Sequence, residues 1–176
     1  MPCFLAPTVV GVLTAALVAQ TAHAAGIEEA EASDAVHEHR FVVGAGGALE
    51  AVGGSSVNLG GSAFLEWGAV DSWLELELGV AILAAEGGVE VPIGLLFKKP
   101  FRLARRVELM VGLGPEVVAY RGTPNDGNFL ALEVAADFMF WPTARFGFWI
   151  EPSYELTARG AGEHSLAATG GLIYGW

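Results

Sequence analysis

The chain has 176 residues, of which 53% are hydrophobic, and it carries a formal net charge of −11 at pH 7. The length suits a single domain, and such an apolar but strongly acidic composition is unusual for a soluble one. The acidity argues against binding to nucleic acid, because no basic patch could offset the repulsion from phosphates.

The chain begins with features of a secretory signal. An apolar run extends from Cys3 to Val18, and residues 22–24 (Ala-His-Ala) have the small-x-small form of a cleavage site, although no Lys or Arg precedes the run. We expect residues 1–24 to be a cleaved signal peptide, and an uncleaved membrane helix is the alternative. Cys3 is the only cysteine, so the mature chain would have no disulfide.

The next segment, residues 25–39, is polar and acidic and shows no strand pattern. We expect it to be a solvated periplasmic tail. His37 and His39 could hold a metal ion loosely, but a metal site normally needs three or four fixed ligands. A tail without metal is the favoured interpretation.

From Arg40 to the end, apolar residues alternate with small or polar ones, and turn-forming residues interrupt the pattern. This period of two is typical of a β-strand with one apolar face. The strands are long for a globular protein and suit a tilted strand that crosses a bilayer. The predicted strands are 40–51, 57–67, 73–84, 89–98, 107–120, 130–140, 146–156 and 164–176.

The volume of the side chains indicates which face of the strands lies inside. One set is bulky and apolar, and the other consists mainly of Gly, Ala, Ser and carboxylates. The interior of an eight-stranded barrel is only wide enough for side chains to fill it, so the bulky set should face lipid. In hydrocarbon every backbone group must be paired within the protein, so the sheet must close. The sequence therefore predicts an all-β fold, an eight-stranded antiparallel up-and-down transmembrane β-barrel over residues 40–176.

Aromatic residues should mark one end of this barrel. If the amino terminus is periplasmic, the connections 68–72, 99–106 and 142–145 lie at the periplasmic end. The boundary between membrane and water favours aromatic side chains, which form girdles there. The residues assigned to this girdle are Trp67, Trp73, Phe97, Trp141, Phe146 and Trp176.

The signal sequence, the eight alternating strands, the girdle and the aromatic final strand (residues 170–176, GGLIYGW) resemble the small OmpA/OmpX-type outer-membrane β-barrels of Gram-negative bacteria. The resemblance covers residues 40–176 and implies a location in the cell outer membrane. It also implies contact with outer-membrane lipid and recognition of the C-terminal strand by the barrel-assembly machinery. That strand usually ends in Phe in the family and ends in Trp176 here. We expect a monomer without a cofactor and without the peptidoglycan-binding domain that some members carry.

Three prolines fall inside predicted strands: Pro92, Pro115 and Pro152. A proline removes one donor from the ladder of hydrogen bonds, so we expect a β-bulge at each. The alternative is a weakened seam that gives lipid a lateral route into the barrel.

Inward-facing carboxylates greatly outnumber inward-facing bases. At the periplasmic end they are predicted to form a charge-paired plug, which comprises Arg40, Glu66, Glu75, Glu77, Lys98 and Glu108. Farther along the barrel a carboxylate cluster is predicted, which comprises Glu116, Glu133, Asp137, Glu151 and Glu155. Close carboxylates in a confined space cannot all ionise, so some should hold protons at neutral pH. Structural packing is the favoured interpretation, and a cation or proton site is the alternative.

Catalysis is not expected. Some barrels of this class cut acyl chains from lipid A with a His-x-Ser pair on one strand face. Here His164 and Ser165 are adjacent and should point to opposite faces. The sequence thus predicts no catalytic residue, no cofactor and no metal ligand. It favours a non-catalytic barrel that serves envelope integrity or surface interaction. A narrow cation-preferring channel, a lipid A-modifying enzyme and a lipocalin-like carrier are the alternatives.

Overall fold

The computed structural model describes residues 39–53, 56–122, 126–158 and 163–176. The predicted signal peptide and nearly all of the predicted acidic tail lie outside these ranges. Within the described part of the chain, no helix has the length and apolar character needed to span a membrane.

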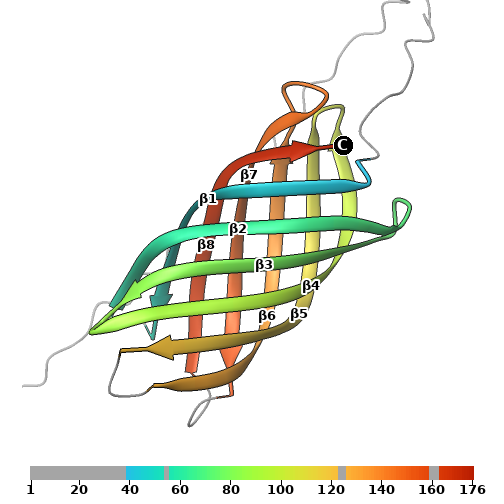
Figure 1. The fold of residues 1–176 in the computed structure, drawn as a ribbon. Helices are drawn as coiled ribbons and strands as arrows, with labels where there is room; N and C mark the ends of the chain where they lie inside the picture. Colours follow the sequence, from blue (N-terminus) through green and yellow to red (C-terminus); the bar gives the residue numbers. More distant parts are fainter. Residues whose placement is uncertain (1–38, 54–55, 123–125, 159–162) are drawn as a thin grey trace, which may run out of the picture. The chain divides into compact units, whose positions relative to one another are not determined.

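The described residues form one closed antiparallel barrel in which every strand pairs with its sequence neighbour and the last strand pairs with the first (Figure 1). This confirms the predicted fold and the number of strands. Backbone hydrogen bonds join the start of the first strand to the end of the last one, from Arg40 N to Trp176 O and from Trp176 N to Phe41 O, both at 3.1 Å. The strands are β1 (Phe41–Val52), β2 (Ser56–Val70), β3 (Leu74–Ala85), β4 (Gly88–Ala104), β5 (Val107–Arg121), β6 (Gly127–Phe140), β7 (Phe146–Thr157) and β8 (Glu163–Gly175).

Strand β4 is longer than the sequence predicts. The predicted connection 99–106 shortens to residues 105–106, because β4 continues to pair with β5 from Lys99 opposite Val111 to Arg102 opposite Glu108. We call this end of the barrel the turn end. Residues 71–73, 105–106 and 141–145 connect the strands there. The opposite end, where residues 53–55, 86–87, 122–126 and 158–162 connect the strands, is the loop end.

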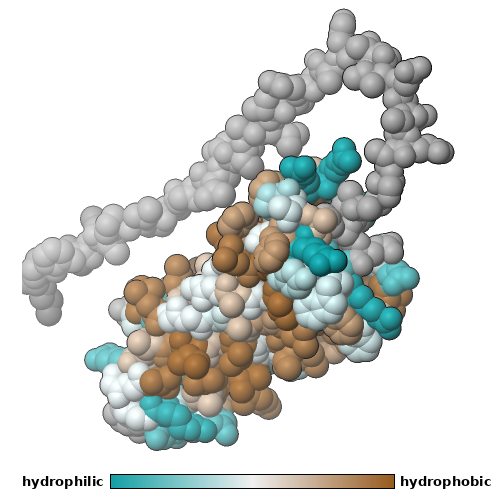
Figure 2. Space-filling model, turned by 45° about the horizontal axis from the view of Figure 1, so that its top comes forward, coloured by the Kyte–Doolittle hydropathy of each residue, from teal (hydrophilic) through white to brown (hydrophobic). Residues whose placement is uncertain are grey.

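The bulky apolar residues lie on the outside of the barrel, as predicted. Side chains such as Leu130, Phe148 and Leu172 are more than half exposed. Hydrophobic residues cover much of the wall in Figure 2, and hydrophilic ones gather toward its ends. The interior instead buries carboxylates and a lysine. A soluble protein buries its large apolar side chains, so this arrangement requires an apolar medium around the wall.

The interior is less polar than the sequence suggests. Alongside small residues and carboxylates it contains an apolar cluster, in which the Phe64 and Trp149 rings meet edge to face with centroids 5.2 Å apart. The prediction of a lumen filled by small residues and carboxylates is therefore correct only in part. This apolar cluster comprises Val42, Phe64, Met110, Met139, Trp141, Trp149 and Ile173.

Several inward-facing glycines sit where a side chain would meet the neighbouring strand. A Cβ on Gly60 would collide with the carbonyl oxygen of Ile82 on β3, and one on Gly114 with the carbonyl oxygen of Leu95 on β4. Glycine is the residue that permits such a close approach of two backbones.

A Gly114→Ala substitution is expected to lower the free energy of unfolding by about 1–3 kcal/mol or to prevent folding, because the added methyl group forces two backbones apart. Gly47→Ala is the matched control, since a Cβ on Gly47 meets nothing within 4 Å. Urea-induced unfolding in lipid vesicles measures the difference. Equal midpoints for the two variants would contradict the assigned packing.

The prediction of a bulge at each strand proline is wrong. Around Pro92, the pairs Val80–Ile93 and Leu83–Glu90 keep one register, and only the pairs between them are missing. Pro115 and Pro152 likewise interrupt the ladder on one side alone, toward β4 and β6 respectively, without a shift. A proline lacks the one N–H that would bond to one neighbour, so the other side of the strand is unaffected. The register shifts lie near the turn end instead, at Gly68/Val70 and Arg102/Ala104.

Candidate functional site

The most highly charged site in the interior surrounds Lys98. The alternation of β4 directs this side chain inward, where it is 0% exposed. Its Nζ atom lies 2.6 Å from Glu77 Oε2 and 2.6 Å from Glu151 Oε2. Asp137 Oδ2 is 3.2 Å away and Glu66 Oε2 is 3.9 Å away. One buried cation therefore serves four carboxylates, which we call the Lys98 cluster.

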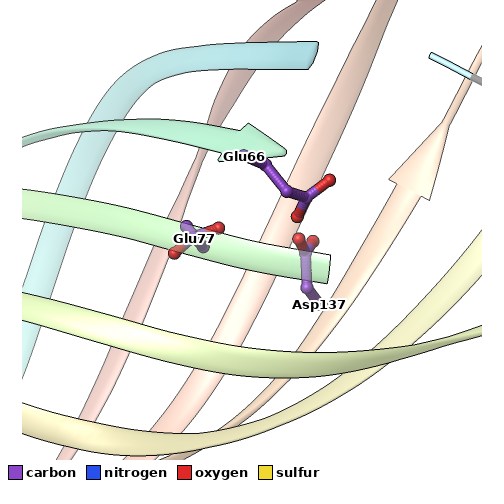
Figure 3. A group of neighbouring side chains, drawn as sticks. All are labelled: Glu66, Glu77 and Asp137. Carbon is purple, nitrogen blue, oxygen red and sulfur yellow. The ribbon is translucent and has the colours of Figure 1, made fainter. Parts of the chain in front are cut away.

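These carboxylates come from four different strands, β2, β3, β6 and β7. In Figure 3 the carboxylates of Glu66 and Asp137 face one another, and Glu77 lies on the neighbouring strand β3. Mutual repulsion would separate such groups at low dielectric, so the ammonium group is what holds them together. Lys98 also packs against the apolar cluster, with Nζ 5.7 Å from the centroid of the Phe64 ring.

The predicted charge plug is only partly assembled. The structure brings Glu66, Glu77 and Lys98 together, but Arg40 is exposed and forms no ion pair within 4.0 Å among the described residues. Glu75 and Glu108 are half-buried and lie outside the Lys98 cluster. Asp137 and Glu151, which were predicted to belong to the carboxylate cluster, contact Lys98 instead and complete the Lys98 cluster. The tilt of the strands sets which inward positions share a level, and strand alternation does not reveal it.

Trp141 was wrongly predicted to be in the aromatic girdle. It is 1% exposed, donates a hydrogen bond from Nε1 to Glu108 Oε2 at 3.2 Å and packs against the His39 ring with centroids 4.5 Å apart. Its backbone N–H bonds to Arg106 O, so Trp141 continues the pairing of β6 with β5. It therefore has the inward parity of Met139, a signal that the sequence already contained. The other girdle residues are exposed on the wall: Trp67, Trp73, Phe97, Phe146 and Trp176.

A second interior group lies toward the loop end and centres on an amide. Asn58 Nδ2 donates to Glu90 Oε2 at 2.9 Å and to Glu50 Oε2 at 3.2 Å. All three side chains are buried. The sequence pattern did not single out Asn58, although the alternation of β2 already predicts that its side chain points inward. The amide supplies donors to two carboxylates that have no ion-pair partner within 4.0 Å in the described structure.

The third group consists of Glu116, Glu133 and Glu155, here called the glutamate triad. One carboxylate oxygen from each lies within 4.8 Å of the others. Glu133 and Glu155 face each other across β6 and β7, and Glu116 comes from β5. Glu116 Oε1 is buried and has no hydrogen-bond partner. The predicted carboxylate cluster is therefore divided, because Asp137 and Glu151 belong to Lys98, the only buried basic side chain among the described residues.

A cavity of about 70 Å³ lies between the Lys98 cluster and the glutamate triad. Its size is sufficient for several water molecules. Its polar lining consists of Ser62, Glu77, Glu116, Glu133, Glu151, Ser153, Glu155 and Thr169.

The chemistry available in this interior is that of oxygen ligands. Carboxylate and hydroxyl oxygens bind protons, water and hard cations. His164 and Ser165 do not form a base–nucleophile pair: His164 is exposed and stacks near Tyr154 with centroids 6.3 Å apart, whereas Ser165 is buried inside.

Comparison with known proteins gives similarity in structure alone. No protein-family model matches the sequence, and a search of curated proteins finds no match. Neisserial surface protein A is similar in structure, with a TM-score of 0.63 at 12% identity over 77% of this chain and 97% of that one. A designed transmembrane β-barrel has a TM-score of 0.53 at 12% identity over 78% of this chain and 97% of its own.

The N-terminal β-barrel domain of Pseudomonas aeruginosa OprF has a TM-score of 0.50 at 14% identity over 78% of this chain and 98% of that domain. At these identities the similarity establishes the fold. The chain has the fold of the small eight-stranded outer-membrane β-barrels.

Proposed function

We propose that this chain is an integral outer-membrane protein that serves envelope integrity through its barrel and catalyses no reaction. The observation that carries the proposal is the inverted distribution of side chains. Bulky apolar residues cover the wall, and the charged groups are buried inside. Lipid is the medium that such a wall requires, and only a closed sheet satisfies its own backbone in lipid.

Basic side chains at the turn end support the predicted orientation, in which the amino terminus of the chain lies in the periplasm. Lys99 lies in the girdle, with Nζ 5.7 Å from the centroid of the Trp73 ring and 2.9 Å from Ser72 O. Basic side chains beside an aromatic girdle can bind lipid phosphates at the membrane surface. The basic residues of this end are Arg40, Lys99, Arg102, Arg105, Arg106 and Arg145.

The filled interior favours a barrel that does not conduct. The Lys98 cluster and the apolar cluster occupy the turn-end half, and the cavity between the Lys98 cluster and the glutamate triad measures about 70 Å³. Short loop-end connections, such as residues 86–87 between β3 and β4, favour a structural role over that of a large adhesin.

Two measurements test location and form. The outer-membrane fraction of expressing cells should contain the protein, and its mobility in SDS gels should shift on boiling, because a closed barrel resists SDS until heated. A soluble periplasmic protein without a shift would replace this proposal with a lipocalin-like carrier.

A third measurement tests envelope integrity. Cells that lack the protein should admit more of a hydrophobic dye than cells that contain it. Unchanged dye entry together with reduced surface attachment would instead favour surface interaction.

The acidic interior supports a cation-preferring channel as the second candidate, since carboxylates would attract cations and repel anions. Recording from planar bilayers distinguishes the two functions. We expect no discrete conductance steps from the purified barrel, because a lysine and aromatic rings occupy its interior. Reproducible cation-selective steps would establish the channel and overturn the non-conducting barrel.

A further inference from the structure

We propose that Glu116, Glu133 and Glu155 bind a Ca²⁺ ion inside the loop-end half of the barrel. The site goes beyond the structural role proposed above and does not depend on it. Its ligands come from β5, β6 and β7, three consecutive strands whose pairing fixes their relative positions.

The geometry of the glutamate triad suits this ion. Ca²⁺ takes oxygen ligands at about 2.3–2.6 Å, so two oxygens on opposite sides of one ion lie roughly 5 Å apart at most. One oxygen from each glutamate lies within 4.8 Å of the others. Mg²⁺ demands near-ideal octahedral geometry at about 2.0–2.1 Å and gives up its water reluctantly, so a site built from protein carboxylates suits Ca²⁺ better.

The three interior groups differ in how their negative charge is compensated. Lys98 supplies an ammonium group to the first, and Asn58 supplies donors to Glu50 and Glu90 in the second. The glutamate triad has no basic side chain within 4.0 Å among the described residues. Confined carboxylates need protons, hydrogen-bond donors or a cation. One divalent cation would contact all three glutamates and offset two of their three negative charges.

A second observation points to a ligand at this position. Glu116 is 5% exposed, yet its Oε1 atom is buried without any hydrogen-bond partner. The same is true of the hydroxyl of Ser165, which lies opposite Glu155 across β7 and β8. Buried polar atoms are nearly always paired, so the unpaired oxygens of Glu116 on β5 and Ser165 on β8 indicate a missing partner that accepts lone pairs.

The surroundings leave room for that partner. Gly94 has no side chain to occupy the space beside these carboxylates. A Cβ there would be 3.3 Å from Glu133 Oε2 and 3.6 Å from Glu116 Oε2. The cavity of about 70 Å³ extends along all three glutamates and also contacts Ser153. Water molecules in this cavity can supply the ligands that complete a Ca²⁺ site of six to eight oxygens.

Calorimetric titration of Ca²⁺ into the full chain, purified from the outer membrane in detergent and treated with a chelator, tests the site. We expect saturable binding of one ion with a Kd on the order of 10⁻⁴ to 10⁻³ M, and weaker binding of Mg²⁺. A Glu116→Gln variant should bind at least tenfold more weakly. Ca²⁺ should also raise the thermal unfolding midpoint of the wild-type barrel and leave that of the variant unchanged.

Two variants with the same charge change serve as controls. Glu66→Gln alters a buried carboxylate of the Lys98 cluster, and Glu86→Gln alters an exposed one between β3 and β4. Both should retain wild-type Ca²⁺ affinity. The proposal is overturned if the wild type shows no saturable binding, or if Glu116→Gln binds as the wild type does. Equal weakening by Glu86→Gln would also overturn it, because binding would then reside on the surface. If Glu116→Gln shows no heat-dependent mobility shift, Glu155→Gln takes its place under the same criteria.

Discussion

Replacement of Lys98 by methionine is expected to lower the free energy of unfolding by about 3–5 kcal/mol, the cost of leaving buried charges without their partner. Methionine preserves most of the volume of the side chain and removes its charge. Glu77 and Glu151, each 2.6 Å from Nζ, would then lose their cation inside the barrel. Urea-induced unfolding in lipid vesicles, followed by tryptophan fluorescence, measures the change.

The adjacent Lys99 provides the matched control. Lys99→Met removes the same charge at the barrel wall, where Nζ contacts the Ser72 carbonyl oxygen and the Trp73 ring. We expect it to cost less than about 1 kcal/mol, as exposed charges usually do. Similar unfolding midpoints for the two variants would contradict the role assigned to Lys98.

A double-mutant cycle resolves the interaction further. Glu77→Gln should destabilise the wild type, because Lys98 loses a close partner. The same substitution in the Lys98→Met background should cost less or should stabilise, since it removes one unpaired buried charge. Additive effects would mean that the two side chains do not interact as the structure places them.

Trp141→Ala should be the second most damaging substitution, with a loss of about 3–5 kcal/mol of unfolding free energy. Trp141 fills the interior, bonds to Glu108 and packs on His39, so its truncation leaves a cavity and an unpaired acceptor. Trp73→Ala is the control, because the Trp73 side chain lies exposed in the girdle. Its loss should cost much less in vesicles.

This pair of variants distinguishes the two positions proposed for Trp141. If the residue belonged to the girdle, the two substitutions would have similar effects. Fluorescence quenching by brominated lipid gives an independent measurement, since Trp73 should be quenched and Trp141 should be protected inside the barrel.

The wall of the barrel could be predicted from the sequence because its signal is local. Successive residues of a strand point to opposite faces, so Leu130, Leu132 and Val134 indicate a lipid-facing side without reference to any other strand. The contrast in volume between the two faces then decides which is inside. Eight such segments separated by turns also determine the strand count and an up-and-down order, which the structure confirms.

The partners inside the barrel were decided by tertiary structure. Alternation correctly directs Lys98, Asp137 and Glu151 inward, but it does not specify which of them meet. Their level depends on the tilt and stagger of strands that are distant in sequence, such as β4 and β7. The same dependence explains why one lysine collects four carboxylates while, among the described residues, Glu116 has no basic side chain within 4.0 Å. The sequence by itself thus determined the faces, the strands and the medium of this protein, because these follow from neighbouring residues. Only the closed barrel decided which charges compensate one another, because that depends on distances across its interior.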